Sequence, residues 1–360
     1  MTRRVYGLAV ALAVLMGGLS VAAAWWLDLP LRDPDGTFGP SWLRLPLIAL
    51  GCFLADVVPR GIYRARGLRG SRAHFRAVVR ERWTQARVSL IVVGLGSFYL
   101  TYVGYRNLKS FLPWIRDHTY DAQLAALDRV LAFGYEPATV LQDILGTGIA
   151  AHILSVFYVG YLVFVPVSLA AWLVWSRNMA GGLWYTTALC VNWTLGLASY
   201  YLIPSWGPAF ANPALFRDLP DTSVRALQAE LWAHRYEVLL DPNATQAVSS
   251  IAGFASLHVS VVFTAALITH MTVRNKWARW AMWAYLPVTV VATLYFGWHF
   301  IADDIAGLAI GLVAVWVGAW VTGHELRPKY RGLIFGSGEP EDLPPPRTPG
   351  NRELETLQTT

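Results

Sequence analysis

Charged residues are scarce in this chain of 360 residues, of which Asp, Glu, Lys and Arg together make up 14%. A soluble globular domain carries about 25%, so the chain lacks the charge to cover a water-facing surface. Cysteine is scarcer still, because Cys52 and Cys190 stand alone inside apolar runs and support neither a disulfide framework nor a thiolate metal site. The sequence also lacks a Gly-x-Ser-x-Gly elbow, a P-loop and a dinucleotide-binding fingerprint. A disordered chain, a disulfide scaffold and an ordinary cytosolic enzyme are therefore excluded.

Long apolar runs are what the chain has in abundance. Hydrophobic residues make up 55% of the sequence, and a helix that crosses a bilayer needs about 20 mostly apolar residues. Many of the 17 tryptophans lie near the ends of these runs, at the headgroup level that indole prefers. The sequence therefore predicts an all-α fold, a polytopic membrane bundle of about eight transmembrane helices in the plasma membrane. The predicted spans are Val5–Leu27, Trp42–Val58, Val88–Tyr105, Ile149–Trp175, Gly182–Ile203, Phe254–Val273, Ala278–Gly297 and His299–Val321.

Arginine placement sets the expected orientation of these spans. The connection after the second span holds nine arginines between Arg60 and Arg87, and the positive-inside rule places such a connection in the cytoplasm. Bilayer topology accounts for these charges, so we expect contact with anionic lipid headgroups here and no nucleic-acid partner. The other basic segments, which fall on the same side in an eight-span arrangement, are residues 3–4, 177, 274–279 and 327–331.

Three regions follow from this arrangement. Residues 1–87 are expected to hold two N-terminal spans and the basic connection, and residues 88–325 are expected to form a second transmembrane domain. Residues 326–360, rich in proline and polar residues, are expected to be a disordered cytoplasmic tail. In the last span, Gly307 and Gly311 form a small-xxx-small pair, which predicts close packing against another helix.

Two long connections remain on the outer side of the membrane. The first, Arg106–Gly148, is expected to contain interfacial helices, because Leu124, Leu127 and Leu131 are spaced for one apolar face. The second contains proline and glycine turn signals, and its middle, Thr222–Leu240, is expected to form a short polar helix. Loops on this side are where a substrate-binding surface is expected.

One compact set of ionisable side chains lies at the mouth of the predicted bundle, where such groups are costly. His258 enters the outer end of the sixth span, His299 opens the eighth, and Asp303 follows at i+4 on the same face. Both spans run inward, so the histidines share one depth, and the carboxylate can fix the tautomer of His299. A nucleophilic histidine, an orienting aspartate and a second histidine as acid form a phosphoryl-transfer set. Two helix N-termini at this point favour an anion such as phosphate.

Two other interpretations of these residues stay open. A His–Asp pair at i and i+4 is common on helices for structural reasons, and histidines at span ends are ordinary. A metal site of two histidines and one aspartate is the competing chemistry, although no His-x-x-x-His or cysteine pair supports it. The joint pattern of two histidines at helix starts on one side favours catalysis, with neither a metal nor a cofactor expected.

These motifs resemble those of a known family. Ser-Leu-His at 256–258, followed by His299-x-x-x-Asp303, is similar to the second and third motifs of the type-2 phosphatidic acid phosphatase superfamily. The closer resemblance is to its inositol phosphorylceramide synthase-like branch, and Tyr200–Pro208 fits the neighbourhood of the first motif. The resemblance covers residues 88–322 and implies a six-helix phosphatase-like core with an active site on the outer face.

The resemblance also implies roles for individual residues. His299 would attack phosphorus and form a phosphohistidine, Asp303 would orient it, and His258 would protonate the leaving group. Asp121 and Asp128, in Tyr-Asp and Leu-Asp pairs upstream, are similar to residues of the same branch.

The chain departs from the phosphatases of this superfamily in its basic residues. Those enzymes clamp phosphate with a lysine and an Arg-Pro pair in the first motif and an arginine six residues before the third-motif histidine. Here the first-motif neighbourhood has no basic residue, and Thr293 stands at the position of that arginine. The clamp must come from elsewhere, with Ser256 as one candidate, and these losses fit the synthase-like branch better. The basic candidates on the outer side are Arg106, Lys109, Arg217, Arg225 and Arg235.

The sequence thus leads to one main hypothesis and two alternatives. The main hypothesis is an integral membrane phosphotransferase that acts on a lipid phosphoester donor and moves inositol phosphate or another phospho-head group to a lipid or glycolipid acceptor. The first alternative is a phosphatase of lipid phosphates or polyprenyl (pyro)phosphates, with water as the acceptor. The second is a non-enzymatic lipid transporter or scaffold, which the paired histidines and the scarcity of charge within the spans argue against.

Overall fold

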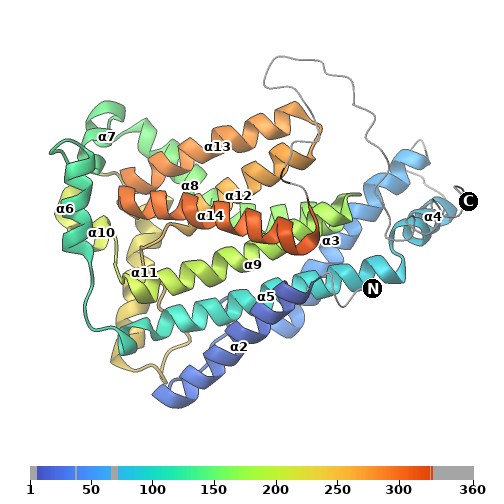
Figure 1. Ribbon diagram of the computed structural model, residues 1–360, viewed down its shortest axis with the longest axis horizontal. Helices are drawn as coiled ribbons and strands as arrows, with labels where there is room; N and C mark the ends of the chain where they lie inside the picture. Colours follow the sequence, from blue (N-terminus) through green and yellow to red (C-terminus); the bar gives the residue numbers. More distant parts are fainter. Residues whose placement is uncertain (1–5, 37–38, 66–71, 325, 327–360) are drawn as a thin grey trace, which may run out of the picture.

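The computed structural model describes residues 6–36, 39–65, 72–324 and 326, which form helices joined by loops and contain no strand (Figure 1). The predicted tail lies outside this described part apart from residue 326, and so do the basic segments 3–4 and 327–331. The helices at the predicted spans are α2 (Gly7–Leu27), α3 (Ser41–Arg64), α5 (Gln85–Ile115), α8 (Ile149–Ala170), α9 (Met179–Leu202), α12 (Leu257–Thr272), α13 (Lys276–Tyr295) and α14 (Ile301–Thr322). The shorter elements are α4 (Arg72–Arg82), α6 (Asp121–Leu131), α7 (Pro137–Leu145), the π-helix η2 (Ala171–Trp175), α10 (Pro208–Ala211), the 3-10 helix η3 (Pro213–Phe216) and α11 (Ser223–Leu240).

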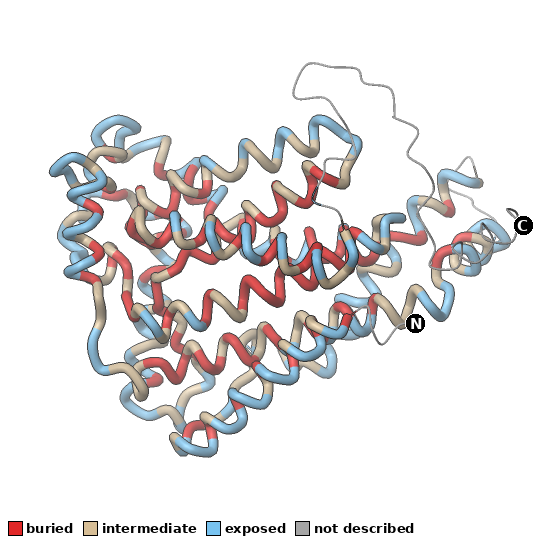
Figure 2. Tube along the Cα trace, in the orientation of Figure 1, coloured by how far each residue is buried: buried red, intermediate tan, exposed pale blue. Residues whose placement is uncertain are grey.

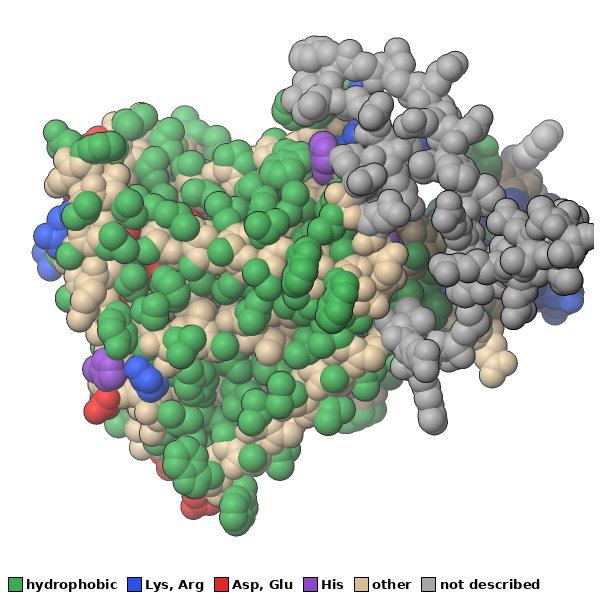
Figure 3. Space-filling view, in the orientation of Figure 1, with side chains coloured by type: hydrophobic (Ala, Val, Ile, Leu, Met, Phe, Trp, Pro, Cys, Tyr) green, Lys and Arg blue, Asp and Glu red, His purple; other side chains and the backbone are tan. Residues whose placement is uncertain are grey.

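The fold class predicted from hydropathy is confirmed. Five helices are long and apolar enough to cross a membrane, namely α2, α3, α5, α8 with η2, and α14, while α12 is a shorter apolar helix of 16 residues. Much of the flank of the bundle carries hydrophobic side chains, and charged side chains gather toward its two ends (Figure 3). This division is the one that a multi-pass membrane protein requires, because lipid contacts the flank and water contacts the ends.

Helix α9 forms the centre of the bundle. It packs against α2, α5, α12 and α14, and the tube coloured by burial is red along most of it (Figures 1 and 2). Its buried Asn192 is satisfied inside the bundle: it donates to the Ala188 carbonyl at 2.9 Å and to Thr264 of α12 at 3.0 Å. A central helix of this kind needs polar contacts and close fit rather than an uninterrupted apolar surface.

Close packing of α14 on α12, predicted from its glycine pair, is confirmed. A Cβ added at Gly307 would lie 2.4 Å from the Ser256 carbonyl oxygen, and one at Gly311 would lie 2.8 Å from that of Ser260. Any side chain at these two positions would force the helices apart. The glycines therefore set the distance between the helices that begin at the two histidine motifs.

The two ends of the bundle hold different elements (Figure 1). Helices α6, α7 and α10 lie at the end where α14 begins, whereas α4 lies at the opposite end. The predicted polar helix is present as α11, and α5 extends its predicted span to residues 85–115. The end that carries α4 is called the arginine-rich end below, and the end where α14 begins is called the histidine end.

Candidate active site

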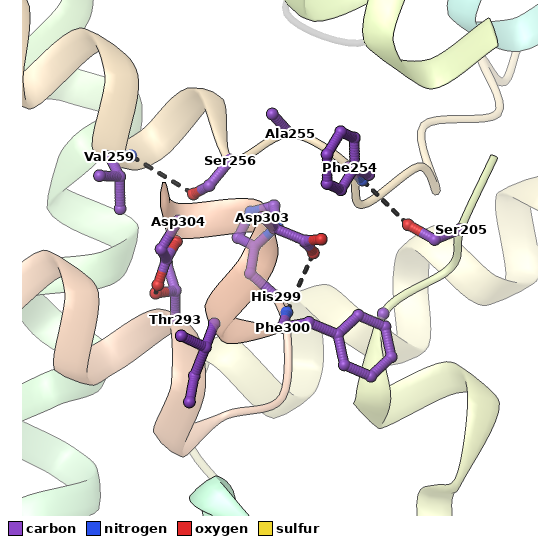
Figure 4. Close-up of polar contacts among 12 residues, drawn as sticks. Ser205, Phe254, Ala255, Ser256, Val259, Thr293, His299, Phe300, Asp303 and Asp304 are labelled. Atoms are coloured by element: carbon purple, nitrogen blue, oxygen red, sulfur yellow. Dashed lines mark hydrogen bonds and ion pairs between the residues drawn. The ribbon is translucent and has the colours of Figure 1, made fainter. Parts of the chain in front are cut away.

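His299 lies in the turn between α13 and α14. Gly297 in this turn has a φ of +67°, and a Cβ there would lie 2.2 Å from the Phe216 ring, so the turn requires glycine. His299 is 5% exposed, and its Nδ1 lies 3.3 Å from Oδ2 of the fully buried Asp303. The structure thus brings together the two residues that the i, i+4 spacing pairs (Figure 4).

Helix α14 begins two residues later than predicted, so that His299 precedes it. The cause is Asp303, whose Oδ2 also accepts the backbone N–H of Phe300 at 2.9 Å and thereby caps the first turn at Ile301. One carboxylate therefore contacts the histidine and fixes where the helix starts. The other oxygen, Oδ1, is buried and has no hydrogen-bond partner among the described residues.

His258 lies in the first turn of α12, at the same end of the bundle. Ser256 precedes this helix, and its hydroxyl accepts the N–H of Val259 at 3.4 Å. The backbone N–H of Ser256 donates to the Asp303 carbonyl at 2.9 Å, which ties the start of α12 to the start of α14. The rings of His258 and His299 consequently lie 5.7 Å apart between centroids. The two motifs meet in one site.

Aromatic rings hold His258 in place. Tyr158 of α8 stacks on its ring at 4.5 Å between centroids, and Tyr161 contacts it at 4.3 Å. Tyr158 also stacks on Trp298, the neighbour of His299, at 5.1 Å with 6° between the planes. The sequence analysis missed both tyrosines. Their i, i+3 spacing in an apolar run was the available signal, and it is too common to identify a site.

The inward face of α6 differs from the predicted leucine face. Leu124 is buried, but Leu127 and Leu131 are exposed, because the helix turns Asp121 and Asp128 toward the bundle. Both aspartates are at most 7% exposed. The helix therefore contributes carboxylates to the histidine end and leaves two leucines at the outside, where an interfacial helix contacts lipid.

These two carboxylates hold the loops on which the site rests. Asp121 accepts the N–H groups of Trp206 and Gly207 at 2.9 Å each, and Asp128 accepts the N–H of Ile301 at 2.9 Å. The first turn of α14 is thus occupied by a protein anion, so its Ile301 amide is not free for phosphate as the sequence had suggested. Burial raises the pKa of Asp128 to about 6, although the Ile301 N–H opposes the shift, and burial also raises the pKa of Asp121.

Among the five basic candidates, Lys109 is the one whose charge interacts with His258. Its Nζ lies 4.6 Å from the centroid of the Tyr200 ring and 3.5 Å from the Tyr105 hydroxyl, and its charge interacts with His258. Lys109 lies on α5, far from the motifs in sequence, and the two tyrosines hydrogen-bond each other at 3.3 Å. The structure thus places near His258 a basic side chain that the motifs themselves lack.

The other four basic candidates occupy different positions. Arg106 hydrogen-bonds the hydroxyl of a tyrosine one turn earlier on α5 at 3.3 Å. Arg235 of α11 lies over the Trp206 ring at 5.3 Å, beside the loop that Asp121 holds, and burial lowers its pKa. Arg225 lies in the first turn of α11, and Arg217 is exposed after η3. Only Arg235 in this group contacts a loop that borders the histidines.

Two further polar residues of the site were missed from the sequence. Asp304, which is 4% exposed, accepts a hydrogen bond from the Thr293 hydroxyl at 2.9 Å, so the residue at the motif-arginine position contacts a carboxylate (Figure 4). Ser205 accepts the N–H of Phe254 at 2.9 Å and its carbonyl accepts the N–H of Gly253, which fixes the loop before α12. An aspartate directly after Asp303 was the visible signal, since buried carboxylates in an apolar helix are rare.

A small cavity of about 60 Å³ adjoins His299 at the histidine end. Its lining also includes Phe300, Asp121, Asp128 and Asn212. Within the described ranges, no cluster of three or more His, Cys, Asp or Glu side chains has the arrangement of a metal site. Of the two motif histidines, His299 is therefore the one that lines this cavity.

Comparison with known proteins agrees with this site. The sequence pattern of the PAP2 superfamily matches residues 122–317, which is more than half of the chain and includes both histidines and Asp303. The chain therefore belongs to the PAP2 superfamily. A segment of 61 residues is 38% identical to lipid A 4'-phosphatase of Porphyromonas gingivalis, covering 17% of this chain and 26% of that protein. The match thus spans about a quarter of the relative, and no solved structure matches the chain.

Proposed function

We propose that the protein is an integral membrane phosphotransferase that acts on lipid phosphoesters through a phosphohistidine at His299. The observation that carries this proposal is the convergence of His299, Asp303 and His258 at one end of the bundle. Membership of the PAP2 superfamily supports the same chemistry. With the arginine-rich end in the cytoplasm, the site lies on the outer face of the plasma membrane.

The proposed reaction proceeds in two balanced steps. Asp303 holds Nδ1 of His299, so Nε2 attacks phosphorus, the P–N bond forms and the P–O bond to the leaving lipid alkoxide breaks. His258 gives its proton to that alkoxide oxygen. In the second step His258 takes a proton from the acceptor hydroxyl, whose oxygen attacks phosphorus as the P–N bond breaks. Both histidines end in their starting states.

Lys109 is the proposed phosphate clamp. Its charge interacts with His258, and a lysine supplies charge without the fork geometry of arginine. Its position on α5, outside the residues that match the superfamily, agrees with the loss of the usual motif cations. Ser256 already caps α12, so we assign it a positioning role and leave phosphate binding to Lys109 and backbone amides.

The acceptor distinguishes two versions of the proposed activity. The missing motif cations favour the inositol phosphorylceramide synthase-like branch, in which inositol phosphate or another head group moves to a lipid or glycolipid hydroxyl. The match to a lipid A 4'-phosphatase instead favours water as the acceptor and a phosphomonoester of a glycolipid as the substrate. Both versions share a phosphohistidine intermediate, and they differ in the donor that forms it and in the acceptor that breaks it.

The test is a product analysis with purified protein in mixed micelles. Phosphatidylinositol with a lipid alcohol is supplied in one reaction and lipid A in another, and inorganic phosphate and new lipids are measured by mass spectrometry. A new phosphorylated lipid supports transfer, whereas inorganic phosphate from lipid A supports the phosphatase. If His299→Ala protein forms the same products at the same rate, the proposed function is wrong in both versions.

A further inference from the structure

Helix α4 is fixed against α3 at the arginine-rich end, far from the histidines. The Phe75 ring occupies the space beside Gly61, where an added Cβ would lie 2.4 Å from it. Arg82 is 9% exposed and forms two hydrogen bonds of 2.9 and 3.0 Å with the fully buried Asp56 of α3. The Trp83 indole donates to the same carboxylate at 3.1 Å. The relative position of α3 and α4 is therefore set by buried contacts.

An open groove of about 360 Å³ remains between these two helices. Phe53 and Val57 from α3 and Phe75 and Val79 from α4 line it, and Arg76 and Arg80 line it with the carbon chains of their side chains, so its whole lining is apolar. The volume falls within the range of small-molecule pockets, which is about 300–1,000 Å³. An apolar groove with two cations along one side matches the shape of an acyl chain joined to a phosphate.

The charge around this groove is strongly positive. Arg72, Arg76 and Arg80 are exposed and follow one another at i+4, so they form a stripe along one face of α4. Glu81, the acidic residue of the helix, is paired with Arg64 at 2.5 Å. The charges on the stripe are thus available to an anion, and the groove lies at the end of α3, a helix apolar enough to cross the membrane.

We infer that this groove is a binding site for one anionic phospholipid of the leaflet at the arginine-rich end. An acyl chain lies between Phe53, Val57 and Val79, and the lipid phosphate contacts Arg76 and Arg80. Membrane phospholipid is the occupant because the groove opens beside a transmembrane helix, where lipid is the surrounding solvent. The site is separate from the histidine end and does not depend on the proposed enzymatic activity.

The test uses the full chain, delipidated in detergent and titrated with phosphatidylglycerol or phosphatidylcholine under native mass spectrometry. Arg76→Gln with Arg80→Gln should weaken retention of phosphatidylglycerol by about 30-fold, because each basic residue contributes about fivefold near such a surface. Val79→Trp, which fills the groove and keeps every charge, should release the same lipid. Arg274→Gln with Lys276→Gln, which removes equal charge on the same side, is the matched control and should change retention by less than threefold.

Two outcomes would overturn the inference. If the Arg76/Arg80 variant retains phosphatidylglycerol as well as the Arg274/Lys276 control, the stripe is not the phosphate contact. If Val79→Trp leaves retention unchanged while the arginine variant loses it, the arginines attract headgroups generally and the groove holds no acyl chain. A thermal melt of each variant in detergent identifies misfolding, and Phe53→Trp provides a second groove-filling variant from α3.

Discussion

The two ends of the bundle use opposite charges for the same structural purpose. At the histidine end, carboxylates accept backbone N–H groups, as when Asp128 binds the first turn of α14 and Asp121 binds the loop before α10. At the arginine-rich end, guanidinium groups donate to backbone carbonyls at the end of η2, with Arg87 2.7 Å from the Val174 oxygen and Arg82 3.1 Å from the Trp175 oxygen. Helix α14 begins at the first end and η2 ends at the second, so each charge opposes the helix dipole it meets.

This difference shows which charges remain for a substrate. Asp121, Asp128 and Arg82 are occupied by backbone groups or by other side chains, so they hold the loops in position and are not free for a ligand. Lys109 interacts with tyrosines and with His258 but forms no ion pair within the described residues. Lys109 of α5 is therefore our proposed source of the cation that the proposed chemistry needs.

The largest expected effect is at His258. Replacement by Ala removes the acid that protonates the leaving oxygen, and general acid catalysis contributes about 100- to 10,000-fold. The kcat/KM for a lipid alkyl phosphoester, which reports formation of the phosphoenzyme, should fall by this amount. The kcat/KM for an aryl phosphoester, whose leaving group needs little protonation, should be largely kept. The measurement is kcat/KM for both donors. An equal loss for both would contradict the assignment of His258 as the acid.

The next largest effect concerns stability at the other end. Asp56→Ala leaves Arg60 and Arg82 without their buried carboxylate, and breaking such a buried pair costs about 3–5 kcal/mol. The thermal midpoint in detergent should fall strongly, while kcat/KM of the remaining folded protein at a permissive temperature stays near wild type. Glu81→Gln, which breaks an exposed pair, is the control and should change the midpoint far less. If Asp56→Ala lowers kcat/KM but leaves the thermal midpoint unchanged, the structural role of the charges at the arginine-rich end is wrong.

Lys109 tests whether the cation of the site comes from α5. Lys109→Met should lower kcat/KM by about 100-fold, because a charge-assisted contact to phosphate is worth roughly 1.5–3 kcal/mol, and Lys109→Arg should restore part of it. Lys276→Met, at an exposed position of the other end, is the matched control. The KM for a phosphoester should rise in Lys109→Met, and unchanged kinetics would show that the clamp lies elsewhere.

Much of the bundle and the core of the site could be predicted from the sequence, for physical reasons that particular residues illustrate. Apolar runs must become helices in a bilayer, and the i, i+4 spacing of His299 and Asp303 fixes their proximity locally. The contacts of Lys109, Asp128 and Asp56 depend instead on which helices pack together. The hydropathy of the sequence does not predict that packing. The start of α14 was predicted two residues too early. Asp303 accepts the N–H of Phe300, three residues before it, and so fixes the first helical residue at Ile301.

The smallest expected effect concerns Asp128 and pH. Because burial raises the pKa of Asp128 from 3.8 to about 6, the folded protein binds a proton more tightly than the unfolded chain between these values. Stability is therefore greater at acid pH and falls as pH rises through about 6, by about 1 kcal/mol between pH 5 and 7. Asp128→Asn should lose this part of the pH dependence, measured as thermal midpoints at the two pH values. If Asp128→Asn keeps the full change of stability with pH, other groups are responsible for that change. Asp121→Asn is the comparison variant.

The most direct test of the account is a phosphoenzyme trap that compares the two histidines. Protein is mixed with a phosphorus-labelled aryl phosphoester, quenched in alkali, digested and examined by mass spectrometry for phosphohistidine. The account predicts an adduct at His299 in the wild type and in His258→Ala, a reduced amount in Asp303→Asn, and none in His299→Ala. An adduct that persists in His299→Ala and disappears in His258→Ala would contradict the central claim.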